Sequence, residues 1–282
     1  MITTIFQDNK AYITGEKIDP AIVFDCGQCF RFEKTEDVFH GIAYGQELFC
    51  KNEGNAFVIW PVTEDSFHKI WRQYFDLDYD YNEIDNRFLQ DEILAKTVIK
   101  GMRILHQDPF ETLISFIISA NNNIKRIKKN IDMICRAAGK KIGEDLYAFP
   151  TPEELAKLSI NDLRELGLGY RAPYIAGTTK QILDGFSLEK IGGLTYADAK
   201  KALMGLSGVG PKVADCILLF GFGKREAFPK DVWMRRILLH FYQFEPKNEK
   251  ELEAFAKAHF PEFAGLAQQY LFTYARQNNI SF

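Results

Sequence analysis

The chain has 282 residues, of which 46% are hydrophobic and 26% charged, and it carries a net charge of −3. This length suits one large domain or two modest ones and is enough to bury a core without disulfides. The five scattered cysteines argue against a disulfide framework and indicate a reducing compartment. No apolar run approaches the roughly 20 residues of a membrane span, and the N-terminus lacks the features of a signal peptide. We therefore expect a cytoplasmic protein without membrane contacts.

Residues 1–85 predict a small antiparallel sheet domain, because short apolar and aromatic runs alternate with turn-forming residues. These runs are Ala21–Phe24, Cys29–Phe32, Phe39–Tyr44, Leu48–Cys50 and Phe57–Trp60. The acidic and aromatic stretch 76–85 is typical of a connector.

Residues 86–282 show helical periodicity, which predicts a two-part helical domain and places the chain in the α+β class. One helix start is clear at Gln107–Glu111, where Asp108 caps, Pro109 takes the first helical position and Glu111 completes a capping box. Thr151–Glu154 opens another helix by the same chemistry. Asn121–Asn123 interrupts the first of these helices, and further helices are expected at about 172–184, 196–204, 211–222, 232–241 and after 249.

Basic residues are concentrated between Lys100 and Lys141, where nine basic and three acidic residues leave a local charge of +6. A basic stripe on an otherwise acidic protein can face a phosphate backbone. A solvated helix face would have the same composition, so both interpretations stay open on charge alone.

The segment Leu206–Asp215 predicts a helix–hairpin–helix within residues 196–222. Gly208 and Gly210 permit positive φ and close backbone approach, and Pro211 suits the first turn of the next helix. Free N–H groups and a positive helix end then form an anion site that a DNA phosphate can fill. The alternative is a glycine-rich helical turn without a ligand.

Lys212 lies in the first helical turn after this hairpin, where the helix dipole disfavours an ammonium. A lysine whose pKa is depressed there can attack a carbon as a neutral amine, or it can bind phosphate as a point charge. Asp231 precedes another helical run and suits an N-cap. A carboxylate fixed there also stabilises developing positive charge and helps to move protons.

With these residues the chain resembles the helix–hairpin–helix DNA glycosylases with a Gly/Pro-rich loop and an aspartate, the HhH-GPD superfamily. Within it, the chain is most similar to the bacterial form of the 8-oxoguanine DNA glycosylase/AP lyases with an N-terminal sheet domain. The motifs are Cys26-Gly-Gln-Cys-Phe-Arg31, Gln107-Asp-Pro-Phe-Glu111, Ser119-Ala-Asn-Asn-Asn-Ile124, Leu166-Gly-Leu-Gly-Tyr-Arg171, Gly208-Val-Gly-Pro-Lys-Val-Ala-Asp-Cys216 and Asp231-Val-Trp.

The resemblance implies a monomeric enzyme of the nucleoid that acts on double-stranded DNA containing an oxidised purine, without a metal or cofactor. It implies that the lesion is flipped out, that Lys212 attacks C1′ and that β-elimination then nicks the strand. Asp231 would support the positive charge that develops on the sugar.

The resemblance also implies how the lesion is recognised. The Gly27 carbonyl would accept a hydrogen bond from N7–H, which guanine lacks. Cys216 and Phe272 would sandwich the base, and Gln268 would contact its Watson–Crick edge. Without the resemblance, Cys216 and Phe272 have the pattern of core residues.

Further residues are implied to hold the DNA. Asn121 would fill the gap in the duplex beside a Tyr170 wedge, and Arg126 and Arg171 would bind the orphaned cytosine. Phosphate contacts or solvated charges are the alternatives for the arginines. Trp233 and Pro211 depart from the histidine and threonine common in eukaryotic relatives, so the contacts made there and the preference for cytosine stay open.

Three other interpretations account for parts of the sequence. Cys26 and Cys29 have the spacing of a metal or redox pair, but no second pair at zinc spacing accompanies them. A monofunctional alkylbase glycosylase would need Asp231 and water but no Lys212. A non-catalytic DNA-binding protein would account for the hairpin and leave Lys212, Asp231 and Gly27 without a common purpose.

Overall fold

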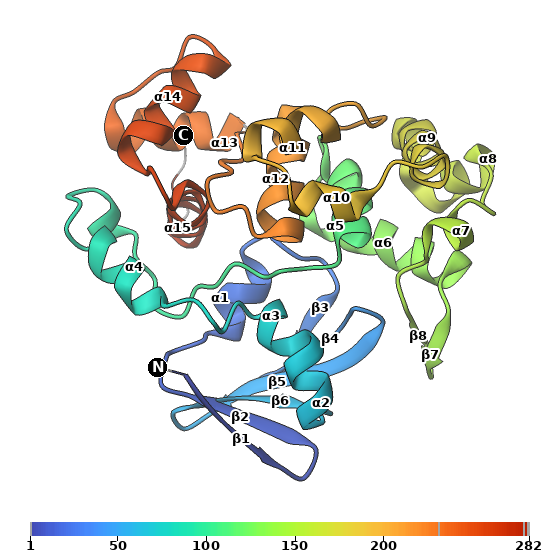
Figure 1. Ribbon diagram of the computed structural model, residues 1–282, viewed down its shortest axis with the longest axis horizontal. Coiled ribbons are helices and arrows are strands. Elements are labelled where there is room, and N and C mark those ends of the chain that lie inside the picture. The colour runs from blue at the N-terminus through green and yellow to red at the C-terminus, as the bar shows by residue number, and fades with distance from the viewer. Residues whose placement is uncertain (1, 231, 279, 281–282) are drawn as a thin grey trace.

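The computed structural model describes residues 2–230, 232–278 and 280. Its N-terminal part is an antiparallel six-stranded sheet with the strand order β1-β2-β6-β5-β4-β3 (Figure 1). The strands are β1 (Thr3–Gln7), β2 (Lys10–Thr14), β3 (Phe32–Thr35), β4 (Val38–Ala43), β5 (Gln46–Glu53) and β6 (Ala56–Trp60).

One face of the sheet is buried under short helices, because alternate strand residues such as Ala11, Ile13 and Ile59 are apolar. The covering segments are α1 (Pro20–Asp25), α2 (Glu64–Ser66), a π-helical turn Phe67–Trp71 and α3 (Arg72–Tyr74). Trp71 is fully buried at the centre of this small core. The short apolar runs separated by turn-forming residues thus predict the sheet correctly, but the run Ala21–Phe24, which predicts a strand, belongs to helix α1.

The rest of the chain is helical. Its helices are α4 (Tyr81–Phe88), α5 (Pro109–Ser119), α6 (Ile124–Ala138), α7 (Pro152–Leu155), α8 (Ile160–Leu163), α9 (Ala172–Leu183), α10 (Leu188–Gly192), α11 (Tyr196–Leu203), α12 (Pro211–Phe222), α13 (Val232–Tyr242), α14 (Glu249–His259) and α15 (Ala264–Gln277). A small hairpin, β7 (Lys141–Gly143) and β8 (Leu146–Tyr147), follows α6. The α+β class is confirmed. The predicted boundary at residue 85 falls inside α4, and the division into two domains stays a prediction.

Helix starts follow the capping chemistry expected from sequence, with one exception. Thr151 and Glu154 form the predicted capping box of α7. At α5, Asp108 accepts a hydrogen bond from the Glu111 N–H, but the Glu111 side chain does not complete a box. It lies instead 3.6 Å from the guanidinium of Arg31, because a buried carboxylate gains more from a cation than from one backbone N–H.

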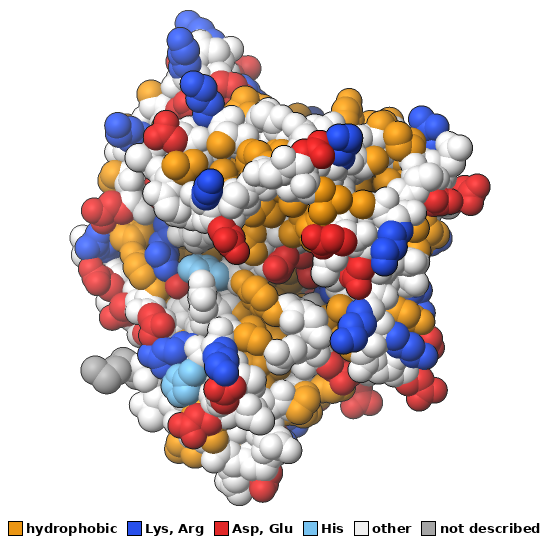
Figure 2. Space-filling model, turned by 45° about the vertical axis from the view of Figure 1, so that its right-hand side comes forward, with side chains coloured by type: hydrophobic (Ala, Val, Ile, Leu, Met, Phe, Trp, Pro, Cys, Tyr) orange, Lys and Arg blue, Asp and Glu red, His pale blue; other side chains and the backbone are white. Residues whose placement is uncertain are grey.

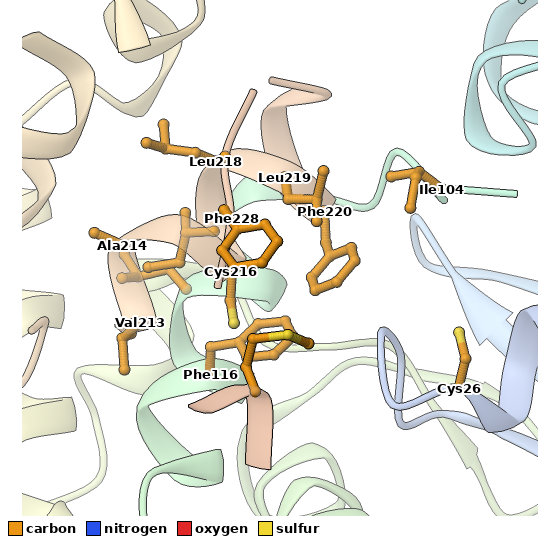
Figure 3. Packing of buried hydrophobic residues seen from close by; sticks show 14 of the residues in the cluster. Cys26, Ile104, Phe116, Val213, Ala214, Cys216, Leu218, Leu219, Phe220 and Phe228 are labelled. Carbon is orange, nitrogen blue, oxygen red and sulfur yellow. The ribbon is translucent and has the colours of Figure 1, made fainter. Parts of the chain in front are cut away.

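Helix α12 runs through the middle of the helical part and is buried along most of its length (Figure 1). It packs against α5, where the rings of Phe116 and Phe220 stack at 5.4 Å. Figure 3 shows Cys216 and Phe220 of α12 beside Phe116, with Cys26 on the sheet side of the same space. The hairpin helix is therefore held rigidly where the two parts of the chain meet. No helix among the described residues is long and apolar enough to cross a membrane.

Candidate active site

A largely apolar cavity of about 670 Å³ opens between the loop after α1 and helices α5, α12, α13 and α15. Its lining includes a set of residues predicted from sequence to act together, namely Gly27, Lys212, Cys216, Gln268 and Phe272. They come from three stretches of chain that are far apart in sequence. A concave apolar site with a few converging polar groups is typical of a ligand pocket.

The loop that carries Gly27 is fixed from below by Gln28, whose side chain is fully buried. The Gln28 amide donates to the carbonyls of Val23 at 2.9 Å and Arg103 at 2.8 Å, and it accepts the N–H of Leu105 at 2.9 Å. All three contacts tie this loop to well-packed backbone, so the loop is held in one conformation. This anchoring role of Gln28 could not be predicted from the sequence, because its side-chain partners lie up to 77 positions away.

Gly27 has φ +82°, which side-chain-bearing residues rarely adopt. A Cβ there would lie 3.8 Å from the Phe272 ring and would intrude on the cavity. Among the described residues, none donates a hydrogen bond to the Gly27 carbonyl. Glycine therefore leaves backbone at the cavity wall open to a ligand, and the carbonyl is available as an acceptor.

Lys212 occupies the first turn of α12, as predicted, and lines the cavity. Its Nζ lies 5.3 Å from the centre of the Phe116 ring, so the ammonium group rests on an aromatic face. The half-buried stem and the apolar wall reduce the water around the amine. Asp231, its predicted carboxylate partner, lies outside the described residues.

Two residues on different helices form walls of the cavity. Cys216 is buried on α12, and Phe272 is half-buried on α15. Gln268 is 6% exposed on α15, and its Oε1 accepts a hydrogen bond from Nε2 of Gln269 at 3.1 Å. The structure thus brings the four predicted lesion-pocket residues together around one space, and it adds Gln269, which was not predicted.

The predicted DNA-gripping residues cluster around the turn between α5 and α6. Asn121 is exposed at its tip with φ +49°. The Tyr170 hydroxyl donates to the Ala120 carbonyl at 3.0 Å, and the Arg171 Nε donates to the same oxygen at 3.0 Å. Arg126, which is exposed, donates to the Gly167 carbonyl at 3.3 Å. Tyr170 and Arg171 therefore contact the backbone of the Asn121 turn directly, and Arg126 is bound to the loop that precedes them.

Arg171 is only 3% exposed, and one of its terminal nitrogens donates to the Asn121 carbonyl at 2.8 Å. Its guanidinium also lies 4.5 Å from the Tyr170 ring centre. These donors hold the Asn121 turn in place. Binding of a cytosine by Arg171 requires exchange of these hydrogen bonds and stays a prediction, whereas Arg126 is already exposed.

The hairpin before Lys212 needs its glycines for two different reasons. Gly208 has φ +78°, and a Cβ there would lie 2.6 Å from Cβ of Tyr174. Gly210 is the N-cap of α12 and is exposed, with no side-chain cap. The first-turn N–H groups therefore face outward at a positive helix end, which favours an anion such as phosphate.

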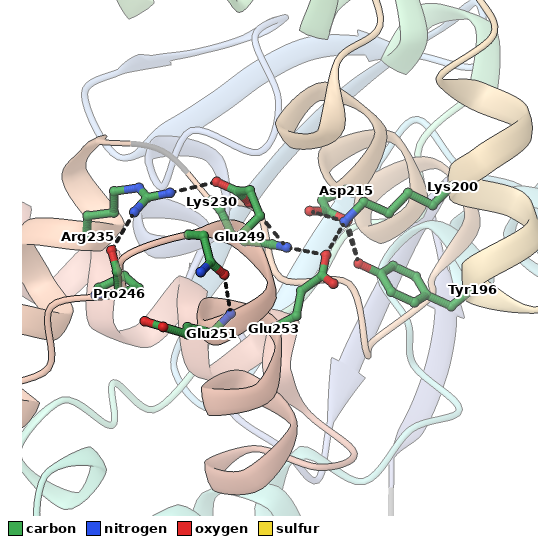
Figure 4. A network of polar contacts seen from close by, with 10 residues as sticks. Tyr196, Lys200, Asp215, Lys230, Arg235, Pro246, Glu249, Glu251 and Glu253 are labelled. Atoms are coloured by element: carbon green, nitrogen blue, oxygen red, sulfur yellow. Dashed lines mark hydrogen bonds and ion pairs between the residues drawn. The ribbon is translucent and has the colours of Figure 1, made fainter.

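Ion pairs that involve buried Asp215 and Lys230 fix the hairpin to helix α14 (Figure 4). Asp215 is fully buried on α12 and accepts hydrogen bonds from Lys200 Nζ at 3.1 Å and from the Tyr196 hydroxyl at 2.6 Å. Glu253 of α14 accepts from Lys200 at 3.1 Å and from Lys230 at 2.6 Å. Burial alone would lower the pKa of Lys200, but the Asp215 carboxylate and the Tyr196 hydroxyl together raise that pKa. The network ties α11, α12 and α14 together.

The predicted basic stripe is only partly a surface feature. Arg103 is fully buried and donates to the Asp76 carbonyl at 2.8 Å and to Glu16. Lys125, Arg126 and Lys129 on α6 are exposed as expected. Figure 2 shows positive and negative side chains interspersed over one face, with hydrophobic side chains between them. The local excess of +6 therefore overstates the charge that a partner meets.

Cys26 and Cys29, which have the spacing of a metal or redox pair, do not have the environment of such a site. Burial raises the pKa of the Cys26 thiol to about 12, and it raises the pKa of Cys29 as well. Both thiols are thus protonated at neutral pH and are poor metal ligands. No group of three possible metal ligands occurs within the described part of the chain.

Comparison with known proteins gives the chain's relationships. Residues 11–113 match the family described as 8-oxoguanine DNA glycosylase, N-terminal domain, and residues 114–262 match the HhH-GPD superfamily base excision DNA repair proteins. A probable N-glycosylase/DNA lyase of Methanothermobacter thermautotrophicus is 37% identical over 258 residues, which is 82% of each protein. The N-glycosylase/DNA lyase of Saccharomyces cerevisiae is 34% identical over 281 residues, 88% of this chain and 75% of the yeast protein.

The fold comparison agrees. A crystal structure of the Clostridium acetobutylicum 8-oxoguanine glycosylase/lyase, in complex with double-stranded DNA containing cytosine opposite 8-oxoguanine, matches with a TM-score of 0.94 at 40% identity. The match covers 99% of both chains. By sequence and fold, the chain belongs to the HhH-GPD superfamily of base excision DNA repair proteins and carries the N-terminal domain of the 8-oxoguanine DNA glycosylases.

Proposed function

We propose that this protein excises 8-oxoguanine from double-stranded DNA and then cleaves the strand at the abasic site. The observation that carries the proposal is the convergence of Lys212, the Gly27 backbone and the Cys216–Phe272 gap on one cavity. A base inside a duplex cannot reach this cavity, so the damaged nucleotide must be flipped out of the stack. The activity is thus that of a bifunctional DNA glycosylase/AP lyase.

Recognition of the lesion depends on one hydrogen bond. 8-Oxoguanine carries a hydrogen on N7, whereas guanine has a lone pair there. The Gly27 carbonyl is an acceptor, so it attracts the oxidised base and repels the lone pair of the normal one. The firm anchoring of Gln28 supports this assignment, because a displaced carbonyl would lose the distinction.

The chemistry follows from an amine beside the sugar. Nζ of Lys212 attacks C1′, the bond from C1′ to the base breaks, and the base leaves with the electron pair and takes up a proton. The sugar ring opens to give a Schiff base between C1′ and Lys212. Loss of a proton from C2′ then expels the 3′ phosphate, and water releases the lysine. In this proposal the carboxylate of Asp231 stabilises the positive charge on the sugar.

The DNA itself is held at the edge formed by the Asn121 turn and the hairpin. Asn121 fills the space left by the flipped base, Tyr170 wedges beside it, and Arg126 and Arg171 approach the opposite cytosine. Gly208 and Gly210 present the hairpin N–H groups to a phosphate. A monomer suffices, since every proposed contact lies on one chain. A chromosomal substrate also supports the expected cytoplasmic location at the nucleoid.

The rival functions differ in whether they form a covalent adduct with DNA and whether they nick it. A monofunctional alkylbase glycosylase forms no covalent intermediate, and a non-catalytic binding protein does not nick. We would incubate the protein with duplexes containing 8-oxoguanine, guanine or an abasic site opposite each base, with and without borohydride. A borohydride-trapped adduct and a nick with 8-oxoguanine are expected, and neither with guanine.

The matched variants are Lys212→Gln and Lys201→Gln. Lys201 is an exposed lysine on α11, the first helix of the same helix–hairpin–helix. Lys212→Gln should abolish trapping and nicking, whereas Lys201→Gln should retain both. Trapping that survives Lys212→Gln would overturn the assignment of the nucleophile.

A further inference from the structure

Helix α15 carries two adjacent buried glutamines that both line the active-site cavity, Gln268 and Gln269. Consecutive residues on a helix do not normally face each other. Here Nε2 of Gln269 nevertheless donates to Oε1 of Gln268 at 3.1 Å. The contact brings a second amide to the residue that reads the base.

This arrangement is not the most stable one for a buried position. Gln269 is 4% exposed, and its own Oε1 is buried without a hydrogen-bond partner among the described residues. A buried acceptor that is left unpaired destabilises the fold. An apolar side chain of similar size would avoid that loss, so the presence of glutamine at 269 points to a role in the site.

The role follows from the two ends of an amide. The oxygen of Gln268 accepts and its nitrogen donates, and rotation by half a turn exchanges the two. Gln269 supplies an N–H to the oxygen end. If Gln268 alone turned around, two N–H groups would face each other, which is repulsive, so the two buried amides can only turn together. Gln269 therefore opposes rotation of the Gln268 amide and stabilises the orientation in which the Gln268 oxygen faces it.

The orientation matters because purines differ at positions 1 and 6. An oxidised guanine presents an acceptor at position 6 and a donor at position 1, and an oxidised adenine presents the reverse. Both carry the N7 hydrogen and the 8-oxo group, so Gly27 cannot tell them apart. Resting on the proposed function, in which Gln268 contacts this edge, we propose that Gln269 is a specificity-determining residue that selects 6-oxo over 6-amino purines.

The test compares excision of three oxidised bases in single-turnover assays on otherwise identical duplexes: 8-oxoguanine, 8-oxoadenine and 8-oxohypoxanthine. The wild type should prefer 8-oxoguanine and 8-oxohypoxanthine, which share the groups at positions 1 and 6. Gln269→Leu removes the orienting donor, so the rate ratio of 8-oxoadenine to 8-oxoguanine should rise by about tenfold. Gln269→Glu should raise it further, because its carboxylate accepts from the amide nitrogen of Gln268 and turns that amide around.

Controls separate specificity from folding. Gln277→Leu changes an exposed glutamine on the same helix and should leave the ratio unchanged. Cleavage at a preformed abasic site, which has no base to read, measures any general loss of activity in Gln269→Leu, and its melting temperature should equal or exceed that of the wild type. Gln269→Leu contains no buried charge, so the test holds even when Gln269→Glu does not fold.

Two results would count against the proposal in different ways. A wild type that does not excise 8-oxoguanine removes the proposed function and this inference together. A wild type that excises 8-oxoguanine, with an unchanged ratio and intact abasic-site cleavage in Gln269→Leu, overturns the role of Gln269 alone.

Discussion

Glu111 is a buried carboxyl group at the start of α5, and its replacement by glutamine should change how stability depends on pH. Its side chain is 13% exposed, and its Oε2 lies 3.6 Å from Nη1 of Arg31. Burial raises the pKa of Glu111 from its usual 4.5 to about 7; Arg31 opposes this shift, and the neighbouring Asp108 adds to it. The burial effect is therefore larger than the attraction of the arginine.

The direction and size of this pH dependence follow from the link between proton binding and folding. A raised pKa in the folded state stabilises the protein fully below the unfolded value, and that contribution is lost as the pH rises through about 7. Between about pH 5.5 and about pH 8, a shift from 4.5 to about 7 removes about 2 kcal/mol from the free energy of unfolding. Glu111→Gln does not titrate and should escape this loss.

Urea unfolding of the wild type and Glu111→Gln at the two pH values measures the difference directly. The stability of Glu111→Gln relative to the wild type should improve by about 2 kcal/mol from about pH 5.5 to about pH 8. Glu226→Gln, at an exposed position, should show no such change. A stability difference between wild type and Glu111→Gln that is the same at both pH values would refute the reasoning.

Three further predictions follow from the site. Gly208→Ala places a Cβ 2.6 Å from Tyr174 at φ +78°, so it should lower stability by about 1–3 kcal/mol and weaken DNA binding, and Gly193→Ala is its control. Lys200→Met removes the cation that pairs with the fully buried Asp215 carboxylate and should lower the free energy of unfolding by about 3 kcal/mol in urea titrations. An unchanged free energy of unfolding would contradict the stabilising role of this ion pair. Arg126→Met should relax the preference for cytosine opposite the lesion by about 1–3 kcal/mol without changing the melting temperature, whereas a lowered melting temperature would assign Arg126 to the fold.

Local rules predicted the features that depend on neighbouring residues. The sheet follows from short apolar runs between turn-forming residues, the starts of α5 and α7 from Asp108 and Thr151, and the hairpin from glycines around a short turn. In each of these the physical cause lies within a few residues of the feature. Lys212 falls in this class as well, since its place in the first turn of α12 is set by Gly210 and Pro211.

Features that depend on distant partners could not be predicted in this way. The sequence predicts Arg103 as part of the basic stripe between Lys100 and Lys141, yet its side chain is buried against Glu16, 87 positions away. Glu111 suits a capping box by spacing, but the tertiary contact with Arg31 takes its side chain. Arg171 is held by carbonyls about 50 positions earlier. In all three, the side chain adopts the strongest available partner, and sequence spacing does not reveal which partner that is.

The lesion pocket was hidden from local reasoning for a different reason. Cys216 and Phe272 have the pattern of core residues, and both do lie against the core of the helical part. A flipped base is itself a flat, largely apolar surface, so the side chains that receive it obey the same burial preference as those that pack on each other. Polar groups help to distinguish the two cases, because a stable core leaves few of them unpaired. Among the described residues, the Gly27 carbonyl and the Gln269 side-chain oxygen both lack a hydrogen-bond partner, and both residues line the same cavity; this combination marks a pocket here.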